Sequence, residues 1–482
     1  MDNRISIHQI KLFSLFLFGG LGCIVLSMLT SHIGLFVAIV CLPVLILLGI
    51  ESVRYPIFLF FLLFTVNYYF LGIGRYIQAE GISFLIDSLL FLLILLIAIH
   101  SILYKNINWK SAVNVLTIGT FIWSIYCIAE IANPTGMLKA WVLSRTLITN
   151  SFVISLVVSI LCIKYRDVKI ITLLLSIFTW TAVAKAVAQK YIGFDFAETN
   201  WLYNGGGALT HIIGSGTRYF SFFTDAGNFG SNMGFAGIFF AITALNVKSK
   251  SGKFYYGLVS LAGIYAMFLS GTRGAIVVPL AGIALYTVIS KNIKACITGG
   301  VLLVAIYIFF AFTYIGQGNT TIRRMRTAFQ PTKDASFIVR RENQKKLAAY
   351  LKNKPFGEGL GLSGGENRKM SMRFTTSIPN DSWYVKLWVE TGIVGAVLYL
   401  GVLFLTIGVG SWLVMFHIHD PELKGRLTAF LCGIFGMLIS AYGNAFWGQY
   451  PTAIIAFTSL SLVLNGRYYD KEITNANRLI TI

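Results

Sequence analysis

The sequence predicts an all-α polytopic membrane protein with about 12–14 transmembrane helices and a long outer (periplasmic) loop that contains amphipathic helices. Three observations support this fold class. Of the 482 residues, 56% are hydrophobic and only 12% are charged. The mean hydropathy is +0.73. Apolar runs of about 20 residues, the length that crosses a bilayer, recur along most of the chain. This composition excludes an ordinary soluble domain.

The apolar runs also predict where the individual spans lie and how they are oriented. Every second short connection is basic or mixed, and these connections fall on one side, so the positive-inside rule places Met1 and the C-terminal tail in the cytoplasm. The candidate spans are 12–30, 33–50, 55–73, 83–104, 111–131, 148–163, 169–189, 229–246, 254–270, 274–290, 295–315, 388–416, 427–443 and 450–466.

Two polar insertions divide the spans into groups. We expect transmembrane helices over 1–190, an outer Gly- and aromatic-rich segment over 191–228, and further transmembrane helices over 229–315. A periplasmic loop over 316–387 follows, and 388–482 forms the C-terminal transmembrane helices and cytoplasmic tail.

The second insertion is strongly cationic. Residues 316–380 hold 13 Lys and Arg against four Asp and Glu, a net charge of +9. A basic cap over a membrane core predicts an anionic ligand at the outer leaflet; a solvated basic loop is the alternative. Within it, residues 334–353 read as a helix, which could lie on the membrane surface through an apolar face.

Two arginines stand beside spans on the predicted outer side. Arg218 lies in "SGTRYFSFFTDAGNFG" and Arg273 in "LSGTRG". Each could snorkel to lipid headgroups or hold a diphosphate with its bidentate guanidinium. Arg218 could instead pair with Asp225. Asn228 is a candidate helix cap or polar ligand to a sugar.

The stretch "NDSWYVKLWVETGIVG" places Asp381 at the lip of a span. A carboxylate there can serve as a general base or as an N-cap. Lys386 and Glu390 are spaced for an i,i+4 ion pair.

Four motifs in order resemble the O-antigen ligase and polymerase superfamily of bacterial surface-glycan assembly. They are Arg218 with Asn228, "SGTRG" with Arg273, "RRENQKKLAAYLKNKPFGEGLG", and "NDSWYVKLWVETGIVG". The resemblance covers roughly 215–405. It implies a multi-pass glycosyltransferase of the bacterial inner membrane, with its active site facing the periplasm and no metal or other cofactor.

The resemblance also implies roles for particular residues. Arginines would hold the diphosphate, and an acid–base residue would deprotonate the acceptor. Ligases carry a catalytic His nine residues before the Glu of "ETG"; here that position is Asp381, as in polymerase-type members. His211 is a possible substitute base. The implied catalytic residues are Asp381, Arg273 and Arg218, and the implied substrate-binding residues are Arg340, Arg341, Asn228, Asn380, Tyr384 and His211.

The expected function is transfer of an undecaprenyl-diphosphate-linked oligosaccharide to an acceptor hydroxyl, as in an O-antigen or surface-polysaccharide polymerase. The expected partners are that donor, a glycan or lipid-linked acceptor and the bilayer, but not nucleic acid. Ligation to lipid A core and O-glycosylation of protein are alternatives within the class. A transporter of lipid-linked glycans is the alternative from another class, but the spans hold few ionisable residues of the kind that mark transport pathways.

Overall fold

The computed structural model describes residues 49, 51–77, 83–214, 216–330 and 335–480. The predicted span 12–30, and all of 33–50 except residue 49, lie outside these residues. Throughout the described part, regular structure is almost entirely helical. Two strands of two residues each, β1 (Ile212–Ile213) and β2 (Gly216–Thr217), form a small antiparallel pair.

The chain divides into two compact units. The first comprises residues 1–62 and 92–106, and in its described part His100 Nδ1 lies 2.8 Å from the carbonyl oxygen of Val53. The second comprises residues 63–91 and 107–482. Two helices contribute residues to both units: α3 (Pro56–Ile77) and α4 (Ser83–Tyr104).

The second unit contains the other α-helices that the described residues form. They are α5 (Val115–Ala129), α6 (Leu138–Leu143), α7 (Arg145–Leu161), α8 (Tyr165–Tyr191), α9 (Phe196–Tyr203), α10 (Ala208–His211), α11 (Ala226–Asn246), α12 (Lys250–Leu269), α13 (Val277–Ile289), α14 (Ile293–Phe312), α15 (Thr320–Arg326), α16 (Ala335–Leu351), α17 (Phe374–Ser377), α18 (Trp383–Phe416), α19 (Pro421–Ser440), α20 (Thr452–Leu464) and α21 (Gly466–Ile480).

The helices confirm the predicted all-α polytopic membrane class. Among the described residues, nine helices are long and apolar enough to span a membrane. The shorter apolar helices Arg273–Ile289 and Thr452–Leu464 match two further predicted spans. The predicted span 83–104 coincides with α4, and the short predicted span 148–163 belongs to a longer apolar segment, Leu138–Leu161.

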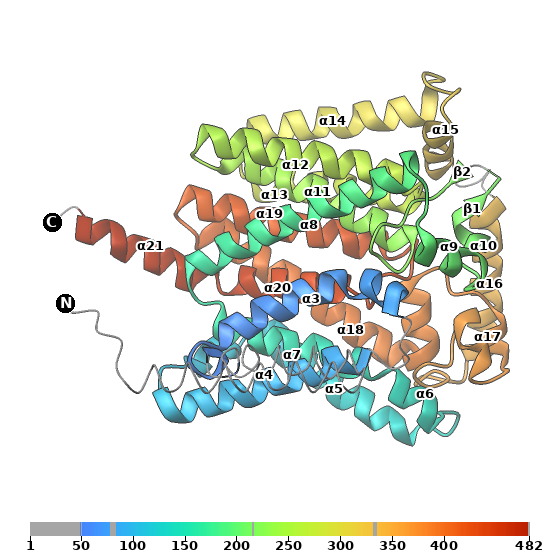
Figure 1. Cartoon of the computed structure of the whole chain (residues 1–482), viewed down its shortest axis with the longest axis horizontal. Coiled ribbons are helices and arrows are strands. Elements are labelled where there is room, and N and C mark those ends of the chain that lie inside the picture. The colour runs from blue at the N-terminus through green and yellow to red at the C-terminus, as the bar shows by residue number, and fades with distance from the viewer. Residues whose placement is uncertain (1–48, 50, 78–82, 215, 331–334, 481–482) are drawn as a thin grey trace, which may run out of the picture. The chain divides into compact units, whose positions relative to one another are not determined.

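Helix α11 is deeply buried in the second unit, and Figure 1 shows it beside α12, α13 and α19. Small residues permit this close packing. A Cβ on Gly263 of α12 would lie 3.0 Å from the backbone nitrogen of Gly237, and Ser260 Oγ donates to the Gly237 carbonyl at 2.7 Å. This packing positions α11, whose N-terminal end carries Asn228 after its cap, Asp225.

Helix α18 is broken at Gly392, where φ is +66° and ψ is −174°. At 1.5 Å per residue, its 34 residues would extend about 51 Å if unbroken, well beyond the roughly 30 Å hydrocarbon core. The Pro355–Gly361 segment fills the break. Glu358 N–H donates to the Val389 carbonyl at 2.8 Å, and Val394 N–H donates to the Pro355 carbonyl at 3.3 Å. The "PFGEGLG" and "ETG" motifs are therefore joined backbone to backbone.

Short helices α9, α10, α16 and α17 lie at one end of this unit (Figure 1). The helix predicted over 334–353 is α16. The two leucines on its predicted apolar face are not free for a membrane surface, because Leu347 and Leu351 are buried in a cluster with Ile378, which precedes α18, and with Val389 of α18. This part of α16 therefore packs against the protein.

Candidate active site

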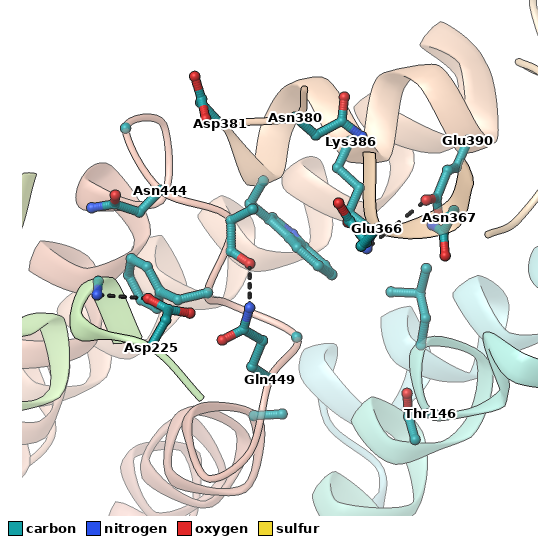
Figure 2. Close-up of a pocket in the computed structure, with 18 of the residues that line it drawn as sticks. Thr146, Asp225, Glu366, Asn367, Asn380, Asp381, Lys386, Glu390, Asn444 and Gln449 are labelled. Carbon is teal, nitrogen blue, oxygen red and sulfur yellow. Dashed lines mark hydrogen bonds and ion pairs between the residues drawn. The ribbon is translucent and has the colours of Figure 1, made fainter. Parts of the chain in front are cut away.

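A cavity of about 730 Å³ lies in the second unit. It is lined by residues of α6, α7, α10, α11, α15, α16, α18 and α20, the 3₁₀ helix Arg273–Ile276, residues 361–370 and the 443–449 connection. Figure 2 shows Asp225 and Asn444 on one side of this space and Glu366 with Lys386 on another. Segments more than 300 residues apart in the chain therefore meet in one polar space.

Four arginines line the cavity: Arg218, Arg273, Arg324 and Arg340. Arg218 is held rigidly, because its Nη1 donates to the Thr210 carbonyl at 2.9 Å and its Nη2 to Thr272 Oγ1 at 2.8 Å. Arg273 Nη1 donates to Thr327 Oγ1 at 3.1 Å. Three of the four were predicted from the sequence. Arg324 was missed, because nothing local distinguishes it from its neighbours in "TTIRRMR".

The arginines form a site of excess positive charge. Burial lowers the pKa of Arg218, and the like charges of Arg273 and Arg340 lower it further, while Asp225 opposes the shift. No ion pair joins Arg218 to Asp225 among the described residues. Asp225 instead caps α11, accepting hydrogen bonds from the backbone N–H groups of Gly227 at 2.6 Å and Asn228 at 3.0 Å. An anionic ligand would relieve the repulsion among the cations.

Asp381 lies at the edge of this cluster. Arg340 Nε donates to its Oδ2 at 3.1 Å, and its side chain is 46% exposed. Asp381 is not the N-cap of α18. That role belongs to Ser382, whose hydroxyl accepts from Val385 N–H at 3.5 Å. The structure therefore excludes the capping role for Asp381, and its role as a base stays a prediction.

His211 lines the cavity but is held by the backbone. Its Nε2 accepts from Ala226 N–H at 3.0 Å, and its Nδ1 lies 2.9 Å from the Gly207 carbonyl. These contacts fix the tautomer with hydrogen on Nδ1. Burial lowers the pKa of His211, as does the charge of Arg218. The geometry favours a neutral, positioning side chain at the start of α11 over a base.

Three predicted substrate-binding residues do not line the cavity. Asn228 is fully buried; its amide donates to the Tyr450 carbonyl at 2.9 Å, and its Oδ1 accepts from Thr452 at 2.6 Å. Tyr384 donates its hydroxyl to the Leu438 carbonyl. Arg341 is exposed on α16. Asn228 and Tyr384 thus join helices, while Asn380, also predicted, lines the cavity.

Two charged residues expected only to stabilise α18 also face the cavity. Lys386 Nζ lies 4.0 Å from Glu390, the predicted i,i+4 pair, and 3.5 Å from Glu366. Glu390 is 1% exposed and accepts a short hydrogen bond from Ser363. The cavity thus has a second charged wall, in which two acids, Glu366 and Glu390, flank one lysine.

The fold and the cavity define a polytopic α-helical membrane protein with an arginine-rich polar site at one end of its helices. Residues 258–400 match the family model for O-antigen ligase. This segment is therefore similar to the O-antigen ligase family, whose members are glycosyltransferase-like enzymes, and the match supports the resemblance to the O-antigen ligase and polymerase superfamily that the motifs predicted. No curated protein matches the chain.

The matched segment includes Arg273, Arg324, Arg340 and Asp381, but Arg218 and the 443–449 connection lie outside it.

Proposed function

We propose that this chain transfers an oligosaccharide from undecaprenyl diphosphate to an acceptor hydroxyl on the periplasmic face of the inner membrane, and that it is a polymerase-type member of the superfamily. The observation that carries the proposal is the gathering of four arginines around one cavity with Asp381 at its edge. Both termini would then be cytoplasmic and residues 316–387 periplasmic, as the short basic connections indicate.

The chemistry requires two kinds of group. As the acceptor oxygen bonds to the anomeric carbon, the bond from that carbon to the diphosphate oxygen breaks, and its electron pair leaves with the diphosphate. Arg218 and Arg273 would stabilise this developing charge, and their fixed orientation means that they need little reorganisation. Asp381 would take the proton of the acceptor hydroxyl. Arg340, bonded to Asp381, would orient it.

The position of Asp381 supports a polymerase over a ligase, since ligases of the superfamily carry a His at this place. Transfer to lipid A core and transfer to a protein hydroxyl use the same donor chemistry. The gathering of arginines at one end of the helices supports a transferase over a transporter, whose sites lie near the membrane midplane.

The test is a transfer assay with purified protein in lipid vesicles and extracted undecaprenyl-diphosphate oligosaccharide as donor. Elongation of the lipid-linked glycan supports a polymerase. Product formed only with lipid A core or a protein acceptor selects one of the other transferases. Movement of the donor across the vesicle without a new glycosidic bond would contradict the proposal. Deleting the gene and analysing the surface glycan gives an independent check.

A further inference from the structure

The cavity wall contains buried polar atoms that the protein leaves without hydrogen bonds. Among the described residues, Ser151 Oγ, Trp383 Nε1, Asn444 Nδ2 and both amide atoms of Asn380 are buried and have no partner. All four residues line the cavity. Buried polar groups in folded proteins are normally paired, because an unmade hydrogen bond costs free energy. Four such residues around one space indicate that a ligand supplies the missing partners.

Asn444 and Trp383 are placed by glycines on neighbouring segments. A Cβ on Gly274 would lie 2.5 Å from Asn444 Nδ2, so the glycine makes room for this amide beside Arg273. A Cβ on Gly448 would lie 2.5 Å from the Trp383 ring. The two glycines therefore leave room for both side chains at the cavity wall, although their polar atoms remain unpaired.

The four residues differ in chemistry from the arginine cluster. They offer neutral amides, a hydroxyl and an indole N–H, all of which suit the hydroxyl and acetamido groups of a sugar. A phosphate is better matched by guanidinium groups. We infer that Ser151, Asn380, Trp383 and Asn444 form a carbohydrate subsite for the sugar that adjoins the donor diphosphate. This inference rests on the proposed function and adds a division of the cavity into a diphosphate part and a sugar part.

The unpaired atoms are covered, so the sugar reaches them after small side-chain rotations. Asn380 and Asn444 lie just before α18 and in the 443–449 connection, respectively, outside the rigid centres of helices. Ser151 lies in α7 and is 3% exposed. We therefore expect the side chains of Asn380 and Asn444 to rotate toward the ligand and to uncover Ser151 Oγ, while α7 stays in place.

The experiment compares binding of two lipids by protein in nanodiscs: undecaprenyl diphosphate without sugar, and extracted undecaprenyl-diphosphate oligosaccharide. The variants are Asn444→Leu, Asn380→Ala and Trp383→Phe, the last keeping an aromatic ring but losing the N–H. The matched control is Asn204→Leu at the C-cap of α9, outside this cavity. Thermal unfolding checks that each variant is folded.

We expect each cavity variant to weaken binding of the sugar-bearing lipid about 5- to 20-fold, the effect of one or two lost hydrogen bonds, and to leave binding of the sugar-free lipid within about twofold of wild type. Unchanged binding of both lipids would mean that water alone satisfies these atoms and would overturn the subsite. Equal weakening for both lipids would assign the residues to the diphosphate instead. Failure of the wild-type protein to bind either lipid would overturn the proposed function itself.

Discussion

The carbonyl oxygen of Pro355 occupies the space that a Cβ on Gly392 would need, at only 1.9 Å from that position. Gly392 also has a positive φ of 66°. Two family motifs separated by more than 30 residues thus meet at one backbone position. This contact ends the first part of α18, which carries Lys386 and Glu390, before the apolar part begins.

Replacing Gly392 with Ala should therefore destabilise the protein strongly. The substitution adds backbone strain of about 1–3 kcal/mol and a clash that Pro355 can relieve only by breaking its hydrogen bond to Val394 N–H. We expect a clearly lower midpoint of thermal unfolding in detergent. Gly401→Ala is the matched control, because it lies in the same helix with nothing within 4 Å of its Cβ position. Equal midpoints for the two variants would contradict this account of the break.

The arginine cluster predicts that Lys cannot replace Arg218 or Arg273. Lys keeps the charge but loses the planar guanidinium fork. In Arg218 that fork bonds Thr210 and Thr272 and still leaves one of its faces for the ligand. We expect each Arg→Lys variant to lower the transfer rate about 10- to 100-fold. Arg368→Lys, an exposed arginine outside the cavity, is the control. Normal transfer by both cluster variants would indicate that the arginines merely contact lipid headgroups.

The proposed orientation predicts that residues 316–387 are reached from outside the inner membrane. The position for a cysteine label must be exposed. Ser363 is unsuitable because it is fully buried beside Glu390, whereas Met372 is 83% exposed. In a protein whose native cysteines are replaced, Met372→Cys should react with a membrane-impermeant maleimide in intact spheroplasts. Labelling only after the inner membrane is permeabilised would reverse the proposed topology.

The sequence predicted the helices better than the site, and the reason is physical. Spans such as 83–104 are defined by local apolar composition, which reads directly as a membrane helix. The cavity depends on which distant side chains meet. Asn444, in "AYGNAFWGQ", has no local feature that distinguishes it from any loop asparagine. Conversely, Asn228 looked like a sugar ligand because it follows Arg218, yet the packing of α11 against the residues before α20 buries it.

His211 predicts a pH dependence of stability. Its pKa is lowered in the folded protein, chiefly by burial, so the unfolded chain takes up a proton first as pH falls. The stability that neutral His211 contributes is fully present above its unfolded pKa of about 6.5 and is lost as pH falls below that value. The measurement is the unfolding midpoint between pH 7.5 and 5. Compared with wild type, His211→Gln, which keeps a hydrogen-bond acceptor but cannot titrate, should show a flatter profile; an equally steep one would exclude His211 as the cause.

The proposed role of Asp381 as the base gives the sharpest test. The N-cap of α18 is the neighbouring Ser382, so a substitution of Asp381 can remove the base without removing the cap. Since Ser382 caps α18, Asp381→Asn should leave the midpoint of thermal unfolding nearly unchanged. Loss of a general base typically lowers the rate about 10²–10⁴-fold, and we expect a loss in that range in the purified transfer assay. Binding of undecaprenyl diphosphate should persist, because the arginines remain.

Ser382→Ala is the matched control for Asp381→Asn. It removes the cap and should cost about 1 kcal/mol of stability while leaving most of the transfer rate. The opposite pattern, a folded and almost fully active Asp381→Asn protein, would remove Asp381 from the mechanism. His211 would then be the next residue to test as the base, although it could act only by giving up its hydrogen bond from Ala226 N–H, so His211→Gln should then abolish transfer.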